Sequence, residues 1–366
     1  MTRALSHDFL VDRKDLRRTQ LAPAPDPLET TFRPGHLMLK VESFALTANN
    51  ITYAVFGDAM QYWNFFPAPT GWGRVPVWGY ATVVQSAVNG IENGERLFGY
   101  LPMSSHLMVK PERVTPADFM DASEHRRPLP SPYQLYRRLA GDPGHEPGHE
   151  DARALLYPLF ITSFMIEDFL DDNDVFGARR VVIASASSKT ALGLAHLLQQ
   201  RHGKKCEVIG LTSPGNVAFC ESLGYYSRVL PYDGLETMEK STPTVYVDMA
   251  GDGKLLARVH QHFENQLKHS CIVGATHWEE RATQHQMPGP KPQFFFAPTQ
   301  IKKRTVDWGP GGVDSHYAEA WKAFLLTTVP WLKIQQRRGP AEVQKAYLEV
   351  LEGKSRPELG LILSWA

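Results

Sequence analysis

The chain has 366 residues, of which 43% are hydrophobic and 21% charged, and 39 lysines and arginines balance 39 aspartates and glutamates. This composition is ordinary for a globular enzyme or binding protein, and the zero formal charge excludes a strong electrostatic attraction to nucleic acid or an anionic membrane. No apolar run reaches the ~20 residues of a membrane span, and the charged N-terminus lacks a signal peptide's apolar core. We therefore expect a cytoplasmic protein of about two domains with no nucleic-acid or membrane partner.

The first third of the chain is predicted to be rich in β-strands. His36–Thr47 alternates apolar and polar residues, and Val75–Val84 and Glu95–Tyr100 lie beside Asn-Gly turn signals. His106–Val109 closes this strand-rich region. Residues 111–152 are rich in proline, glycine, histidine and charge, and they are expected to form a long polar insertion.

The segment Arg179–Leu230 predicts a strand, a turn, a helix and a second strand. Val181–Ala184 is β-branched and reads as a buried strand, Ser185–Thr190 is a small hydroxylated turn, and Ala191–Gln200 has helical apolar spacing. Cys206–Leu211 is a second apolar run. Such a βαβ unit indicates a parallel sheet, in which ligands bind at the carboxyl ends of the strands.

Further elements are predicted on either side of this unit. The predicted helices are Leu155–Leu170, Leu255–Leu267, Tyr317–Trp331 and Pro340–Leu351, and the predicted strands are Thr244–Met249, His269–Gly274 and Leu359–Ser364.

Short motifs occur along the chain in a characteristic order. They are LTANN at 46–50, VPVWGYATVV at 75–84, ERLFGY at 95–100, YPLFITSF at 157–164, ESLGYYSRVLPY at 221–232, VDMAG at 247–251, IVGAT at 272–276 and AYLEVLEGKSRPELGLILS at 346–364. In this order the sequence resembles the medium-chain dehydrogenase/reductase superfamily, specifically its zinc-free, quinone-oxidoreductase-like branch.

The resemblance implies an α/β fold with a GroES-like β-rich domain and a Rossmann doubly wound parallel sheet. The GroES-like catalytic domain would comprise residues 1–154 and 345–366, with the insertion at 111–152, and the nucleotide-binding domain would comprise residues 155–344. Members of the superfamily usually bind NADP or NAD and many are dimers, so the resemblance implies a homodimer.

The phosphate-binding turn departs from the family pattern. Where the family has A-x-G-G-V-G, this chain has Ala186-Ser-Ser-Lys-Thr-Ala191. In the family, the glycines let the backbone approach a pyrophosphate, and this chain lacks them. Hydroxyls, a lysine and the helix N-terminus can still bind phosphate, whereas in the alternative interpretation Ser187 or Ser188 only caps the helix. No acidic residue ends the next strand, at Thr212-Ser213, which favours NADP over NAD.

These observations give a predicted cofactor site for NADP(H). The residues predicted to hold the phosphates, including the 2′-phosphate, are Ser187, Ser188, Lys189, Thr190, Ser213 and Asn216. Those expected to approach the rest of the dinucleotide are Thr162, Gly251, Gly274 and Thr276.

The catalytic candidates are Asn50, Tyr53 and His277. Asn50 and Tyr53 fall where the branch places active-site polar groups, and a tyrosine can hydrogen-bond or protonate a carbonyl oxygen; the alternative for Tyr53 is ordinary core. His277 follows a predicted sheet strand and could titrate near neutral pH, although a surface histidine is the simpler interpretation. The aromatic residues between 62 and 78 are either core or the wall of an apolar pocket for a hydrophobic substrate.

Other motifs point away from zinc and hydrolase chemistry. Gly79-Tyr80-Ala81 stands where zinc-dependent relatives have G-H-E, and no cysteine precedes Cys206, so no catalytic or structural zinc is expected. His145-Glu-Pro-Gly-His149 matches H-E-x-x-H, but its proline and glycine oppose a helix, so a solvated loop is expected. The serines at 185–188 lack the glycines of a nucleophile elbow.

Three functions are left open. The first is a zinc-independent, NADPH-dependent reductase of a hydrophobic carbonyl, enone or quinone held between the two domains. The second is a non-redox enzyme on the same scaffold, performing lyase or carbon–carbon bond chemistry with Tyr53, His106 or His277 as acid or base. The third is a non-catalytic protein that has lost the cofactor.

Overall fold

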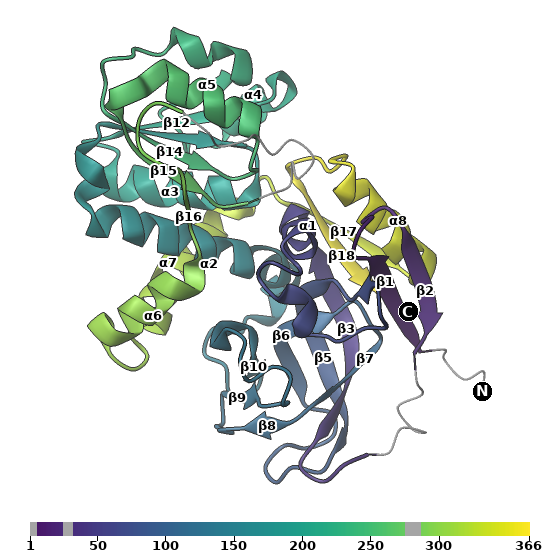
Figure 1. The fold of residues 1–366 in the computed structure, drawn as a ribbon. Coiled ribbons are helices and arrows are strands. Elements are labelled where there is room, and N and C mark those ends of the chain that lie inside the picture. Colours follow the sequence, from purple (N-terminus) through teal and green to yellow (C-terminus); the bar gives the residue numbers. More distant parts are fainter. Residues whose placement is uncertain (1–5, 25–31, 275–286) are drawn as a thin grey trace. The chain divides into compact units, whose positions relative to one another are not determined.

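The computed structural model describes residues 6–24, 32–274 and 287–366, and the chain forms two compact units (Figure 1). Unit 1 comprises Met1–Leu155 and Lys333–Ala366, and unit 2 comprises Leu156–Leu332. The second boundary therefore lies at 332/333 rather than at the predicted 344/345. The reason is that β17 (Lys333–Arg338) pairs with β18 (Leu359–Ser364) in the sheet of unit 1, and the intervening helix α8 (Pro340–Leu351) packs against both strands.

Unit 1 is built on antiparallel strands. Besides β17 and β18 these are β1 (His7–Asp12), β2 (Thr19–Pro23), β3 (Leu37–Leu46), β4 (Trp72–Gly73), β5 (Pro76–Ser86), β6 (Arg96–Pro102), β7 (His106–Val109), β8 (Pro111–Glu112), β9 (Asp118–Asp121) and β10 (Leu135–Arg138). The main sheet runs β17-β18-β3-β5-β6-β10-β9-β8, with β7 also paired to β3, and β2-β1-β4 form a small second sheet. Among the described strands of unit 1, β17 and β18 alone pair in parallel.

The segment 111–152 is part of this sheet and not a separate polar insertion. Its strands β8, β9 and β10 continue the main sheet beyond β6. The polar composition concealed these strands because they are short and because their charges are paired: Arg137 lies 3.0 Å from Asp118, and Arg138 lies 2.9 Å from Glu95.

Helix α1 (Ala48–Val55) follows β3 and starts in a capping box. The Thr47 hydroxyl accepts a hydrogen bond from the Asn49 N–H at 3.3 Å, and the Asn50 side-chain oxygen accepts one from the Thr47 N–H at 2.8 Å. The unit also contains the short 3₁₀ turns η1 (Tyr62–Asn64), η2 (Ser131–Tyr133) and η3 (Pro147–His149).

Unit 2 contains a six-stranded parallel sheet. Its strands are β11 (Arg180–Ala184), β12 (Glu207–Thr212), β13 (Arg228–Pro231), β14 (Thr244–Asp248), β15 (Leu267–Ile272) and β16 (Gln293–Phe294). Their spatial order, β13-β12-β11-β14-β15-β16, is the 3-2-1-4-5-6 order of a doubly wound Rossmann sheet, so the predicted fold class is confirmed. All five residues of β11 are buried, as expected for a strand covered on both faces.

The helices of unit 2 cover both faces of this sheet, with α5 on one side and α2 and α3 on the other (Figure 1). The α-helices are α2 (Glu150–Asp172), α3 (Lys189–His202), α4 (Val217–Ser222), α5 (Gly253–Phe263), α6 (Ala297–Trp308) and α7 (Gly312–Thr328). The 3₁₀ turns are η4 (Asp174–Gly177), η5 (Pro214–Asn216), η6 (Tyr232–Thr237) and η7 (Glu264–Gln266). Across the three described ranges, no helix combines the length and apolarity that crossing a bilayer requires.

Candidate cofactor and substrate sites

The turn after β11 begins with a serine at a demanding backbone position. Ser185 has a φ of +52°, in the left-handed region that most residues other than glycine avoid. The turn is held there by two hydrogen bonds: the Ala186 N–H donates to the Leu211 carbonyl at 2.9 Å, and the Ser188 N–H donates to the Ser185 carbonyl at 2.8 Å. Strain of this kind costs about 1–3 kcal/mol and is concentrated at binding sites.

A cluster of side-chain hydrogen bonds lies where β11 and β12 end. The Ser187 hydroxyl oxygen accepts from the Asn216 amide at 3.0 Å and from the Thr212 hydroxyl at 3.3 Å. Because its oxygen accepts both bonds, Ser187 retains its own proton for donation to a further oxygen. The structure thus brings together two of the predicted phosphate ligands, Ser187 and Asn216, and adds Thr212.

Ser188 is the N-cap of α3. Its hydroxyl accepts from the Ala191 N–H at 3.3 Å, so this serine of the turn caps the helix. Lys189 and Thr190 form the first turn of α3, and the Thr190 carbonyl accepts a 2.7 Å hydrogen bond from Ser163 of α2. The predicted residues therefore surround the positive end of a 14-residue helix, where backbone N–H groups favour anions.

Two tyrosines outside the predicted site support the turn, and they lie just before and just after β13. Tyr226 donates to the Ala186 carbonyl at 2.7 Å, and the hydroxyls of Tyr232 and Ser185 lie 3.3 Å apart. Burial raises the pKa of Tyr232, which keeps its phenol protonated. Both tyrosines lie within the motif at 221–232, and Tyr232 is its last residue. The motif therefore indicated Tyr232, whereas the contact of Tyr226 with Ala186 depends on the register of the sheet. Ser213 lies just past β12 and its side chain makes no cap hydrogen bond.

Two other predicted cofactor residues, Gly251 and Gly274, lie at the same carboxyl edge of the sheet. Gly251 follows β14 with a φ of +74°, and its N–H donates to the buried Asp248 carboxylate at 2.9 Å. Gly274 follows β15 and is buried. Thr162 lies within α2, where its hydroxyl donates to the Pro158 carbonyl at 3.2 Å. Thr276 and His277 lie outside the described residues.

In unit 1, Asn50 is engaged at both ends of its amide. Besides capping α1, it donates from its side-chain nitrogen to the Pro76 carbonyl at 2.8 Å, and the residue is 4% exposed. These contacts link the first turn of α1 to β5. They favour a positioning role for Asn50, since its oxygen is already occupied by the Thr47 N–H.

Tyr53 lies among aromatic side chains in the interior of unit 1. Its hydroxyl accepts from the Trp78 indole N–H at 3.4 Å, and its ring centroid is 4.7 Å from that of Tyr62. Burial raises the pKa of Tyr53, so its phenol is a hydrogen-bond donor at neutral pH. The aromatic residues between 62 and 78 pack on one another and on Tyr100 and Tyr133, so they are part of the aromatic core of unit 1.

The remaining histidine motifs have structural roles. His145 forms a 2.8 Å ion pair with Glu150, and Pro147–His149 is a 3₁₀ turn, so the H-E-x-x-H residues do not share a helix face. His106, the alternative acid or base, lies on β7 with its Nδ1 3.1 Å from the Ser105 hydroxyl.

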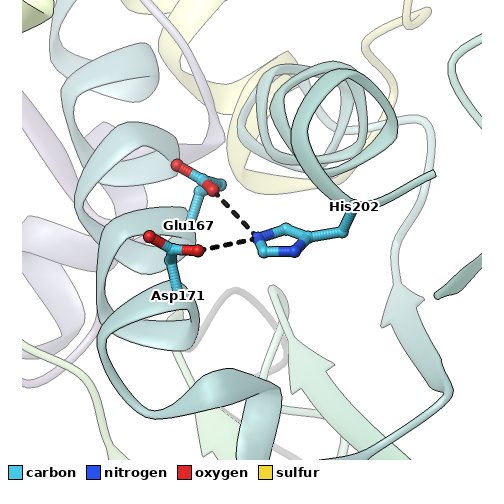
Figure 2. Close-up of side chains that lie close together, drawn as sticks. All are labelled: Glu167, Asp171 and His202. Atoms are coloured by element: carbon cyan, nitrogen blue, oxygen red, sulfur yellow. Dashed lines mark ion pairs between the residues drawn. The ribbon is translucent and has the colours of Figure 1, made fainter. Parts of the chain in front are cut away.

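Figure 2 shows the cluster that α2 and α3 form with Glu167, Asp171 and His202. His202 Nε2 lies 3.3 Å from Glu167 and 3.5 Å from Asp171, and one ligand atom from each residue falls within 4.8 Å of the others. Arg201 contacts the same carboxylates, at 3.2 Å from Glu167 and 3.0 Å from Asp171. Its charge already compensates the acids, and we interpret the group as an ion-pair link between the two helices.

Comparison with solved structures agrees with this fold. CurA from Vibrio vulnificus, in complex with NADPH, superposes with a TM-score of 0.65 at 14% identity; the match covers 98% of this chain and 99% of that one. The yhdH oxidoreductase from Salmonella enterica, in complex with NADP, gives 0.53 at 13% identity, and the CurF ER cyclopropanase of the curacin A biosynthetic pathway gives 0.57 at 12%, each with 98% and 99% coverage.

These likenesses show that the chain shares its fold with these proteins, as the predicted fold class required. Residues 44–356 match a family described as a protein of unknown function (DUF2855), and the chain belongs to that family. No curated protein matches the chain.

Proposed function

We propose that the protein is a zinc-independent, NADPH-dependent reductase of a hydrophobic carbonyl, enone or quinone. The observation that carries the proposal is the polar cluster at the carboxyl ends of β11 and β12. There Ser187 accepts two hydrogen bonds and keeps a free donor beside the N-terminus of α3. Two proteins of the same fold bind NADPH or NADP, which is consistent with this use of the site.

The residues present fit a dinucleotide phosphate. Ser187, Ser188 and Lys189 would hold the pyrophosphate, with hydroxyl and ammonium donors replacing the backbone approach that glycines permit. Ser213 and Asn216 would contact the 2′-phosphate, because no carboxylate at the end of β12 competes for a ribose hydroxyl. When bound, NADPH supplies a hydride.

Unit 1 supplies the acid in this proposal. Tyr53 is protonated at neutral pH and accepts from Trp78, so it can donate toward a substrate oxygen as negative charge develops there. Asn50 fixes the first turn of α1 against β5 and thereby orients Tyr53, three residues further along the same helix. His277, Thr276, Thr162, Gly251 and Gly274 stay predicted contacts of the bound substrate or dinucleotide.

A second candidate is a non-redox enzyme on the same scaffold. It is favoured by the strained Ser185 and the absence of glycine from residues 185 to 191, because both alter the backbone at which a pyrophosphate is usually bound. One protein of similar fold, the CurF ER cyclopropanase, is named for a reaction other than reduction. Turnover that needs no nicotinamide would favour this candidate.

The reductase proposal is tested by following nicotinamide oxidation with enones and quinones. We expect consumption of NADPH well above that of NADH with at least one substrate, and at least a tenfold loss in Tyr53→Phe. Tyr347→Phe is the matched control, because Tyr347 is also a buried tyrosine of unit 1 but donates to the Leu16 carbonyl. Absence of nicotinamide oxidation across the panel, with the protein folded, would contradict the proposal.

Zinc independence, a homodimer and a cytoplasmic location belong to the same proposal. Tyr80 occupies the position of the histidine in the zinc-dependent G-H-E motif and donates to the Glu150 carbonyl at 3.1 Å. Activity that survives exhaustive chelation would support zinc independence, and sedimentation analysis would test the dimer.

A further inference from the structure

Four tyrosines from different elements of unit 1 gather around one point. Tyr53 lies on α1, Tyr62 on η1, Tyr100 on β6 and Tyr133 on η2. The ring centroids of Tyr100 and Tyr133 are 4.8 Å apart, and those of Tyr53 and Tyr100 are 5.6 Å apart. Trp78 of β5 joins this group, with its ring 5.2 Å from that of Tyr100. We call these five residues the tyrosine cluster.

The tyrosine cluster contains one hydroxyl that its own contacts leave unused. Four hydroxyls and one indole N–H provide five donors. Trp78 donates to Tyr53, the hydroxyls of Tyr62 and Tyr133 lie 3.3 Å apart, and Tyr133 is also hydrogen-bonded to Tyr53. Tyr100 is 0% exposed, and its hydroxyl has no hydrogen-bond partner within the described chain.

An unpartnered buried hydroxyl is costly, and this one lies beside three others. Leaving such a group unsatisfied costs about 1–3 kcal/mol. The rings of Tyr53 and Tyr133 both lie against that of Tyr100, and the Tyr133 hydroxyl lies 3.3 Å from that of Tyr62. Burial raises the pKa of Tyr100 well above its usual value, so its phenol stays a hydrogen-bond donor. A group that only accepts hydrogen bonds, held among these hydroxyls, would satisfy Tyr100.

A buried cation stands behind the tyrosine cluster. Arg126 donates to Asp121 at 2.7 Å and to the Tyr136 hydroxyl at 3.0 Å, and Tyr136 in turn donates to the Tyr100 carbonyl at 2.7 Å. The Arg126 guanidinium also lies 5.0 Å from the centroid of the Phe66 ring. It opposes the effect of burial on the pKa of Tyr100, so it favours negative charge there.

We propose that the tyrosine cluster is the binding site for the oxygen of a flat conjugated ligand, either a ring carbonyl or a phenolate. Tyr100 donates to that oxygen together with Tyr53 or Tyr133, and aromatic faces flank the ring. Tyr62 and Tyr133 lie on short 3₁₀ turns, whereas Tyr100 and Trp78 lie on sheet strands and Tyr53 lies on α1. We expect the two turns to move when a ring enters. This inference rests on the proposed function, because the ligand oxygen that Tyr100 binds would be that of the quinone or enone substrate.

The test uses 4-nitrophenol as a probe, with the full chain and no nicotinamide. Donors around the oxygen stabilise the anion, so we expect the phenolate absorbance band to appear on binding at a pH one unit below the probe's own pKa. Tyr100→Phe should weaken this binding by about tenfold or more, as expected for one lost hydrogen bond to a charged acceptor. Tyr133→Phe should weaken it as well.

Thermal unfolding of the same variants separates a binding role from a structural one. Removing a hydroxyl that has no partner in the free protein should leave Tyr100→Phe as stable as the parent or more stable, even as it loses the probe. Tyr246→Phe is the matched control, because Tyr246 of β14 also has a buried, unpartnered hydroxyl but lies in unit 2. It should not change probe binding.

Two results would overturn the inference: no phenolate binding by the parent protein at millimolar probe, or equal binding by the parent and Tyr100→Phe. Titration of the same samples with NADPH keeps the two proposals distinct. Probe binding that depends on Tyr100 without any NADPH binding would sustain the tyrosine site and reject the reductase.

Discussion

Ser187 shows what a single residue contributes to the cofactor site and how far the sequence anticipates it. Its place in a turn between strand and helix follows from local pattern, and so does its proximity to the end of the next strand, beyond which Asn216 was predicted to contact the 2′-phosphate. The contacts of Tyr226 and Tyr232 with the same turn depend on the register of β13 against β12, which local pattern does not encode. The lost glycines are compensated in part by this support.

The contacts of Asn50 differ from those that its place in the sequence predicted. Its position in a family motif predicted a catalytic role, but its side chain bonds to Thr47 and to Pro76, 26 positions away, a contact that no local motif encodes. We therefore predict that Asn50→Ala lowers the free energy of unfolding by about 1–3 kcal/mol, through loss of a cap and a buried hydrogen bond. Urea unfolding measures this, with the exposed Asn64→Ala as control. Unchanged stability with lost turnover would instead indicate direct catalysis.

At the scale of elements, long and periodic segments were predictable and short or polar ones were not. The helix predicted at Leu155–Leu170 is the middle of α2, and the strand predicted at Leu359–Ser364 is β18. By contrast, α6 was missed because Gln300 is its only buried residue, and β17 was missed because its residues are mostly exposed. The helix predicted to reach Leu267 ends at Phe263, because Glu264 adopts a φ of +46°.

The contact between α2 and α3 positions the phosphate turn. Gly193 of α3 lies against α2 so closely that an added Cβ would fall 2.9 Å from the Ser163 hydroxyl, which itself donates to the Thr190 carbonyl. The ion pairs of Figure 2 join the same helices at their far ends. The turn itself contains no glycine, but the first part of α3 has Gly193, which the close packing against α2 requires.

We predict that Gly193→Ala destabilises unit 2 by about 1 kcal/mol, because the steric cost of overpacking exceeds the gain in helix propensity. Ser163→Ala removes the atom that the new methyl group would meet, so Gly193→Ala should cost less in that background. A double-mutant cycle on unfolding free energies measures this coupling. Strictly additive effects would contradict the proposed contact.

At the scale of the whole molecule, three buried histidines of unit 2 make stability depend on pH. His196, His260 and His269 are at most 7% exposed, and burial lowers the pKa of each below its ordinary value of about 6.5. In the unfolded chain these histidines take up protons as the pH falls through about 6.5, whereas in the folded protein the same three side chains are still neutral at that pH. The histidine contribution to stability is therefore complete above that pH and is lost below it.

We predict that the free energy of unfolding falls between pH 7.5 and 5.5. The slope contributed by each histidine is at most about 1.4 kcal/mol per pH unit. His196→Leu should flatten the pH dependence by up to one such slope, because the Nε2 of His196 has no hydrogen-bond partner within the described chain and leucine suits its apolar neighbours. An unchanged slope in this variant would show that His196 titrates normally in the folded state.

The central claim, that a serine-rich turn has kept a nicotinamide cofactor, is tested most directly by calorimetric titration of the protein with NADPH and NADH. We predict micromolar binding of NADPH, weaker binding of NADH, and at least a tenfold loss of NADPH affinity in Ser187→Ala. The exposed Ser222→Ala in α4 should bind like the parent. If neither dinucleotide binds at millimolar concentration, or if Ser187→Ala binds NADPH as tightly as the parent, the assignment of this turn to the cofactor is wrong.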